Sequence, residues 1–220
     1  GRCVTHSTCL LTDTARSFSA TFCAARPLTP ESTSSNITVP VERIPLALNS
    51  LLPNDIRVKK SFECKDEFDG RFSVIKKTYM YLIDNREITT PFASRYSWHY
   101  KYSLDIDKMK RAAEYLIGEH DFVSFMAAGG QVKSTVRTIY SVKIEKNEES
   151  MISISVEGNG FLYNMVRIIV GTLVYVGGGK FEPEYIKEIL DSKERANAGI
   201  TAPPQGLFMK NVDYGCDYEK

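Results

Sequence analysis

The sequence predicts an α+β fold, in which helices pack on one face of a mixed, largely antiparallel sheet. Strand-like segments with alternating or β-branched residues are interspersed with amphipathic helical segments. Two of the strand-like segments are separated only by a short turn at Lys146–Glu149, as in an antiparallel hairpin. With 220 residues, 43% of them hydrophobic and 25% charged, the chain is long enough to bury a substantial core.

The first 36 residues differ in composition from the rest of the chain. They are rich in Ser and Thr, contain three of the five cysteines, and have no Lys or Tyr. Ser17–Phe22 alternates briefly and predicts a strand, whereas Thr29–Asn36 predicts a polar loop or a disordered stretch. We therefore predict an atypical segment over residues 1–36 and a single domain over residues 37–220.

The first half of this domain begins with a short helix over Val41–Leu52, which has five spaced apolar residues and is followed by a proline. Phe72–Ile83 is rich in β-branched and aromatic residues and predicts a strand. Leu104–Ile117 carries an apolar stripe at helical spacing. Asp105 can cap the start of this helix, and the glycine that follows the segment can end it.

The second half begins with strands over Val136–Glu145 and Met151–Glu157, the second of which alternates apolar and polar residues. Phe161–Val176 predicts a helix that is apolar over much of its circumference and therefore mostly buried. Three consecutive glycines end it. Glu182–Leu190 predicts a short amphipathic helix, and Phe208–Val212 predicts an edge strand.

Several kinds of site are excluded by missing motifs. The chain has no Walker loop, no glycine-rich dinucleotide fingerprint and no nucleophile elbow. It has three histidines and five scattered cysteines without ligand spacing, so we predict no metal site, and free thiols in the cytoplasm. The longest apolar run is too short to span a bilayer, and no signal-peptide pattern opens the chain. The missing initiator Met is compatible with a fragment.

Three polar residues lie where a polar side chain needs an explanation. Arg167, inside an apolar helical run, either reaches the rim of the core or points into a polar cleft. Asn159, between two glycines, either forms a plain turn or lets the backbone approach a ligand. Tyr79, on a half-buried strand, either belongs to the core or stacks on a base.

The formal net charge is +1, so overall charge gives no indication of nucleic-acid binding. A discontinuous positive surface is still available from the basic residues Arg57, Lys59, Lys60, Lys76, Lys77, Lys133, Arg137 and Arg167. Such charges form either an RNA-binding surface or ordinary solvated faces.

Six strings, taken in order, resemble the tRNA pseudouridine synthase A (TruA) family over about residues 37–214. They are Ala47–Ile56, Phe68–Tyr81, Gly118–Phe122, Ser134–Ile139, Gly158–Gly171 and Thr201–Leu207. The resemblance implies the pseudouridine synthase fold and a homodimer that works without a cofactor. It also implies isomerisation of uridine to pseudouridine at positions 38, 39 and 40 of the tRNA anticodon stem-loop.

The resemblance also implies roles for particular residues. Tyr79 matches a tyrosine that packs against the flipped-out target base and can serve as a base. Arg167 matches an arginine that pairs with the catalytic aspartate and helps to hold the nucleotide. We add Asn159, Lys77 and Arg137 as candidate RNA-binding residues.

The catalytic aspartate of the family is not recognisable. Its motif, Gly-Arg-Thr-Asp-Ala-Gly-Val-His, is expected before Asn49, but no glycine occurs between Gly1 and Gly70. Asp13 is a weak candidate for a displaced catalytic residue. We therefore predict that the N-terminal half of the fold is incomplete. The alternative to an active synthase is an inactive tRNA-binding fragment or pseudoenzyme of the same family.

Overall fold

The computed structural model describes residues 7–14, 20–22, 39–64, 68–70, 72–130 and 132–215. The chain forms two compact units. One is built from residues up to Lys76 together with those after Phe208, and the other from Lys77 to Phe208.

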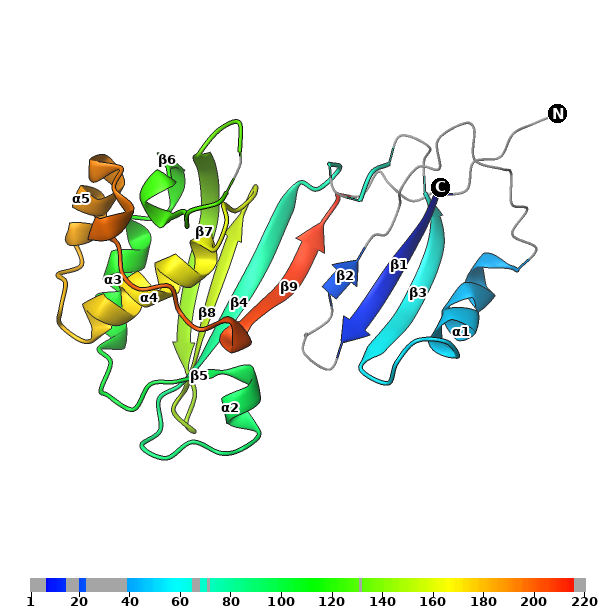
Figure 1. Ribbon diagram of the computed structural model, residues 1–220, viewed down its shortest axis with the longest axis horizontal. Coiled ribbons are helices and arrows are strands. Elements are labelled where there is room, and N and C mark those ends of the chain that lie inside the picture. The colour runs from blue at the N-terminus through cyan, green and yellow to red at the C-terminus, as the bar shows by residue number, and fades with distance from the viewer. Residues whose placement is uncertain are drawn as a thin grey trace. The chain divides into compact units, whose positions relative to one another are not determined.

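The larger unit is organised around a mixed sheet (Figure 1). In sheet order its strands are β5 (Trp98–His99), β4 (Lys76–Asp84), β8 (Met151–Gly158), β7 (Val136–Lys146) and β6 (Gly118–Asp121), and β9 (Leu207–Asp213) also pairs with β4. The β4–β5 pair is parallel, whereas β4–β8, β8–β7 and β7–β6 are antiparallel. The predicted mixed sheet is confirmed, and so is the hairpin of β7 and β8. The alternation in β8 follows burial, with every second residue fully buried.

Three helices gather on one face of this sheet, as predicted: α3 (Ile106–Glu114), α4 (Met165–Gly177) and α5 (Tyr185–Ser192) (Figure 1). The Asp105 carboxylate accepts a hydrogen bond from the Lys108 N–H and so caps α3 as expected. Short turns complete the unit: α2 (Ala93–Tyr96), η2 (Val123–Phe125), η3 (Arg195–Asn197) and η4 (Pro204–Gly206).

Helix α4 begins four residues later than predicted. The apolar run starts at Phe161, but Asn164 has φ 58° and ψ 10°, a left-handed conformation that cannot continue a right-handed helix. The helix therefore starts at Met165, and Phe161–Asn164 forms a turn that leads into it. Eleven of the thirteen residues of α4 are buried, which confirms the predicted core position.

The smaller unit has an antiparallel sheet of β2 (Ala20–Phe22), β1 (Ser7–Thr14) and β3 (Ile56–Cys64), in that order. The predicted strand at 17–22 is present as β2, while residues 17–19 and the predicted polar loop at 29–36 lie outside the described residues. The predicted helix at 41–52 is shorter, with η1 (Val41–Arg43) leading into α1 (Ile44–Asn49). The Asn49 side chain ties the end of α1 to both backbone groups of Val58 on β3.

Candidate functional site

Strand β4 presents two tyrosines on one face, because alternate residues of a strand point the same way. Tyr81 is fully buried, and Tyr79, two residues nearer the start of the strand, is half-buried. The Tyr79 ring meets Phe161 edge to face, with 5.2 Å between ring centroids. Burial raises the pKa of Tyr79, so its phenol stays protonated at neutral pH. In this state the residue offers an aromatic ring and a hydrogen-bond donor.

Arg167 lies in the first turn of α4 and is half-buried. Its Nε donates to the carbonyl oxygen of Ala202 at 2.6 Å, and its Nη1 donates to Oδ1 of Asn164 at 3.0 Å. The backbone N–H of Ala202 returns a hydrogen bond to the carbonyl of Arg167 at 3.1 Å. Within the described parts of the chain, Arg167 forms no ion pair.

The predicted arginine–carboxylate pair stays a prediction, because the partners of Arg167 are known only among the residues that the structure describes. Two neutral oxygens solvate the guanidinium, and partial exposure lowers the cost of its charge. Asp13 lies in β1, opposite Arg57 of β3, and its side chain is outside what the structure describes.

Tyr81 bonds the same segment after α5 that Arg167 bonds. Its hydroxyl donates to the carbonyl of Pro203 at 2.6 Å, next to the Ala202 carbonyl that binds Arg167. Burial raises the pKa of Tyr81, and the nearby positive charge of Arg167 opposes this shift only in part. Tyr81 and Asn164 were not predicted as site residues from the sequence, although both lie within the family strings and Tyr81 shares the strand face of Tyr79.

Two glycines allow this segment to cross α4 closely. A Cβ on Gly171 would overlap the carbonyl oxygen of Ile200, and one on Gly199 would lie 2.6 Å from the backbone of Thr172. The Thr172 hydroxyl accepts a hydrogen bond from the Gly199 N–H at 2.9 Å, which fixes the crossing point. The close approach brings Ala202 within hydrogen-bonding distance of Arg167.

The structure brings the other three candidate RNA-binding residues to one end of the sheet. Gly158 pairs with Lys77 on one side and Ile139 on the other, so Lys77, Asn159 and Arg137 all lie close to this row. Asn159 is hydrogen-bonded to β7. Its Oδ1 accepts from the backbone N–H of Thr138 at 3.0 Å, and its own N–H donates to the Thr138 carbonyl at 3.0 Å.

Arg137 Nη1 donates to the carbonyls of Ser134 and Val136. The lysines and arginine predicted on residues 57–60 belong to β3 in the smaller unit.

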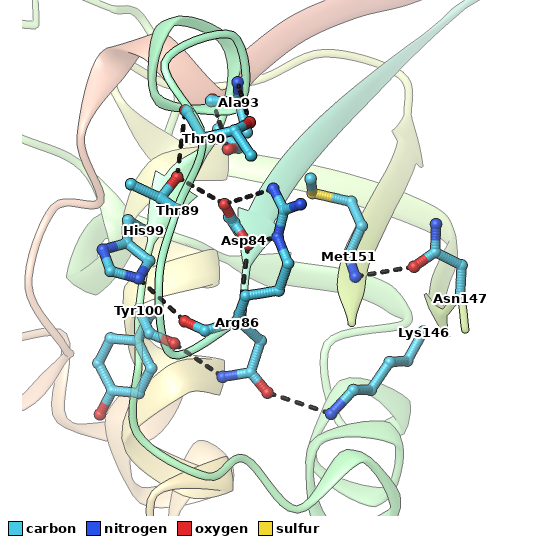
Figure 2. Close-up of polar contacts among 12 residues, drawn as sticks. Asp84, Arg86, Thr89, Thr90, Ala93, His99, Tyr100, Lys146, Asn147 and Met151 are labelled. Carbon is cyan, nitrogen blue, oxygen red and sulfur yellow. Dashed lines mark hydrogen bonds and ion pairs between the residues drawn. The ribbon is translucent and has the colours of Figure 1, made fainter. Parts of the chain in front are cut away.

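A separate polar cluster lies at the other end of β4 (Figure 2). Asp84 is fully buried and accepts from Arg86 Nε and Nη2, at 2.8 Å each, and from the Thr89 hydroxyl at 2.6 Å. These hydrogen bonds lower the pKa of Asp84 to about 2, with the Arg86 side chain as the largest cause. A carboxylate engaged in this way holds the β4–β5 loop together and is not available as a catalytic base.

Membrane-spanning helices and metal-binding clusters are both absent from the part of the chain that the structure describes. No helix there is both long enough and apolar enough to cross a membrane. No group of three or more His, Cys, Asp or Glu residues among those described could hold a metal ion.

Comparison with known proteins identifies the class. A family model described as tRNA pseudouridine synthase matches residues 112–215. The tRNA pseudouridine synthase A of Thermoanaerobacter sp. (strain X514) is 52% identical over 180 residues, which cover 82% of this chain and 73% of the relative. The enzymes of that name from Bacillus pumilus (strain SAFR-032) and Bacillus subtilis (strain 168) are 50% and 44% identical over 178 residues, which cover 81% of this chain and 72% of each relative.

The fold and these matches define a pseudouridine synthase, an isomerase that acts on tRNA. Within that class, the chain belongs to the tRNA pseudouridine synthase A family. The resemblance drawn from the six strings is confirmed.

Proposed function

We propose that this chain isomerises uridine to pseudouridine in the anticodon stem-loop of tRNA, at positions 38, 39 and 40. The observation that carries the proposal is the oriented Arg167 guanidinium at the start of α4, in the same unit as the aromatic pair of Tyr79 and Phe161. A ring pair and a cation suit a flipped-out nucleotide, which needs stacking for its base and a positive charge for its phosphate.

The reaction requires no cofactor. The bond from C1′ of the ribose to N1 of uracil breaks, the uracil turns, and C1′ bonds to C5. The proton on C5 is then lost while N1 gains one, so atoms balance without an oxidant or a metal. Tyr79 and Phe161 would stack on the uracil, and Arg167 would bind the phosphate through its remaining donors. A carboxylate is needed as the nucleophile or to transfer the proton, and Asp13 is the weak candidate for this role.

A second candidate function is tRNA binding without isomerisation. The observation that favours it is that the partners of Arg167, within the described ranges, are the neutral oxygens of Asn164 and Ala202. In this reading the chain retains the nucleotide-holding residues of the family and lacks the carboxylate that works with them.

One experiment separates the two candidates. The purified chain is incubated with an unmodified tRNA transcript, bound tRNA is measured at several salt concentrations, and pseudouridine is mapped by mass spectrometry. Salt-dependent binding with pseudouridine at positions 38–40 supports the synthase, and binding without pseudouridine supports the second candidate. Absence of salt-dependent binding contradicts both.

The proposal includes a homodimer that acts in the cytoplasm, as the family resemblance implies. Sedimentation equilibrium of the purified chain is expected to give twice the monomer mass at micromolar concentration. A mass that stays monomeric up to high concentration would contradict the dimer while leaving the substrate proposal intact.

A further inference from the structure

Asn164 uses its side chain in an unusual way for a residue at a helix start. An asparagine in this position ordinarily has extended backbone angles, and its Oδ1 accepts an N–H from the first turn. Here the backbone is left-handed, with φ 58°, and the side chain makes no capping hydrogen bond. Its Oδ1 instead accepts from Nη1 of Arg167.

The left-handed backbone of Asn164 needs a compensating interaction. Residues other than glycine rarely adopt this conformation, and asparagine is one of the few that tolerate it. Such strained positions persist where surrounding contacts hold them, and they gather at functional sites. Among the described residues, Asn164 accepts two hydrogen bonds: its Oδ1 accepts from Arg167 Nη1, and its carbonyl accepts from the N–H of Ile168 at 3.0 Å.

The guanidinium of Arg167 is therefore held at two of its three nitrogens. The Nε is bound by Ala202 and the Nη1 by Asn164, and because the group is planar these two bonds fix its plane. Within the described residues, Nη2 has no hydrogen-bond partner. Both acceptors are neutral oxygens, so they orient the guanidinium without cancelling its charge.

We propose that Asn164 is a positioning residue: it orients Arg167 through a neutral oxygen so that the full positive charge and the Nη2 donors remain for a tRNA phosphate. The inference rests on the proposed function for the identity of the ligand. A carboxylate at position 164 would orient the arginine equally well but would neutralise it.

A double-mutant cycle on tRNA affinity tests the positioning. Asn164→Gly keeps the left-handed backbone accessible and removes only the side chain. We expect it to weaken tRNA binding by about 10-fold or more when Arg167 is present, in line with loss of one charge-assisted hydrogen bond. In an Arg167→Ala background the same change should have less than about a 2-fold effect. Equal effects in both backgrounds would overturn the proposal.

The charge argument has its own variant. Asn164→Asp is nearly isosteric, so it should leave the thermal unfolding temperature unchanged or raised. It should weaken tRNA binding at least as much as Asn164→Gly and lower the slope of log affinity against log salt by about one. Wild-type affinity and slope in Asn164→Asp would contradict the role of a neutral oxygen.

A measurement without tRNA separates this inference from the proposed function. In ¹⁵N NMR spectra of the free protein, the two bonds should slow rotation of the Arg167 guanidinium, and Asn164→Gly should release it. If the wild-type chain binds no tRNA, the proposed function fails and the NMR result alone decides whether Asn164 positions Arg167. Unchanged guanidinium motion in Asn164→Gly would overturn the inference even if tRNA is bound.

Discussion

At the scale of single residues, the polar cluster of Arg167 at the start of α4 and that of Asp84 at the end of β4 have opposite characters. Arg167 is half-buried and has neutral partners, so its charge is retained at the surface of the core. Asp84 is fully buried, and Arg86 neutralises it through two hydrogen bonds. A retained charge suits ligand binding, whereas a neutralised and saturated one suits structure.

The Asp84 cluster predicts a pH dependence of stability. Because the pKa of Asp84 in the folded protein, about 2, lies below its usual value of 3.8, the ionised carboxylate stabilises the fold fully above about pH 5. This stabilisation is lost as the pH falls from about 5 towards 2. Asp84→Asn should lower the free energy of unfolding at pH 7 by roughly 2 kcal/mol, and the difference from wild type should shrink below about pH 5.

Urea unfolding at pH 7, 4 and 2.5 measures this difference. Asp107→Asn, at an exposed position of α3, is the matched control and should change stability by less than about 0.5 kcal/mol. A gap between Asp84→Asn and wild type that is constant across pH would argue against the lowered pKa.

Tyr79 gives a second prediction at this scale. If its ring stacks on the target base, Tyr79→Ala should weaken tRNA binding by about 10-fold or more, since stacking contributes roughly 1–3 kcal/mol per base. Tyr79→Phe keeps the ring and its contact with Phe161, so tRNA affinity should stay within about 2-fold of wild type. Filter binding measures both. Equal affinity for Tyr79→Ala and wild type would place the base elsewhere.

At the scale of elements, the crossing of residues 198–202 over α4 builds the arginine site. Gly171 allows the crossing. A Cβ on Gly206, in the η4 turn, would lie only 2.8 Å from ring atoms of Tyr81, so the glycine allows this close packing too. Helix α4 and the segment after α5 are far apart in sequence, and the site depends on how closely their backbones pack.

Gly171→Ala tests this packing. Helix propensity alone would make alanine more stable by about 1 kcal/mol at a helix interior position. The overlap with the Ile200 carbonyl should outweigh that gain, so we expect net destabilisation of about 2 kcal/mol. Gly160→Ala is the control, because its Cβ would meet Arg137 only at 3.6 Å. Thermal unfolding measures both variants, and a stabilised Gly171→Ala would contradict the close crossing.

Elements with strong local patterns were predictable from the sequence. The stripe in α3 and the alternation in β8 specify both the type of element and its buried face. Strand β3 was missed because its Lys59 and Lys60 break the alternation and its partner, β1, is distant in the chain. The two-residue β5 is too short for any period.

The candidate site was predictable only in part. Arg167 and Tyr79 could be identified because each conflicts with its apolar surroundings or matches a family string. Asn164 could not, because its left-handed backbone interrupts an apolar run that reads as continuous helix. The carbonyl of Ala202 carries no side-chain signal, so its role follows only from the tertiary crossing.

At the scale of the whole molecule, the formal net charge of +1 means that tRNA binding must depend on local charge. The larger unit supplies such charge at Lys77, Arg137 and Arg167, and family membership makes tRNA the expected substrate. We propose that the target nucleotide binds between Tyr79, Phe161 and Arg167, whether or not isomerisation follows.

Site-specific photocrosslinking tests where the target nucleotide binds. A tRNA with 4-thiouridine at position 39 is bound to the purified chain and irradiated, and the crosslinked peptide is mapped by mass spectrometry. We expect crosslinks to the peptides that contain Tyr79 or Phe161–Arg167, and their loss with excess unlabelled tRNA. Crosslinks confined to other peptides, with tRNA fully bound, would contradict the proposed position of the nucleotide.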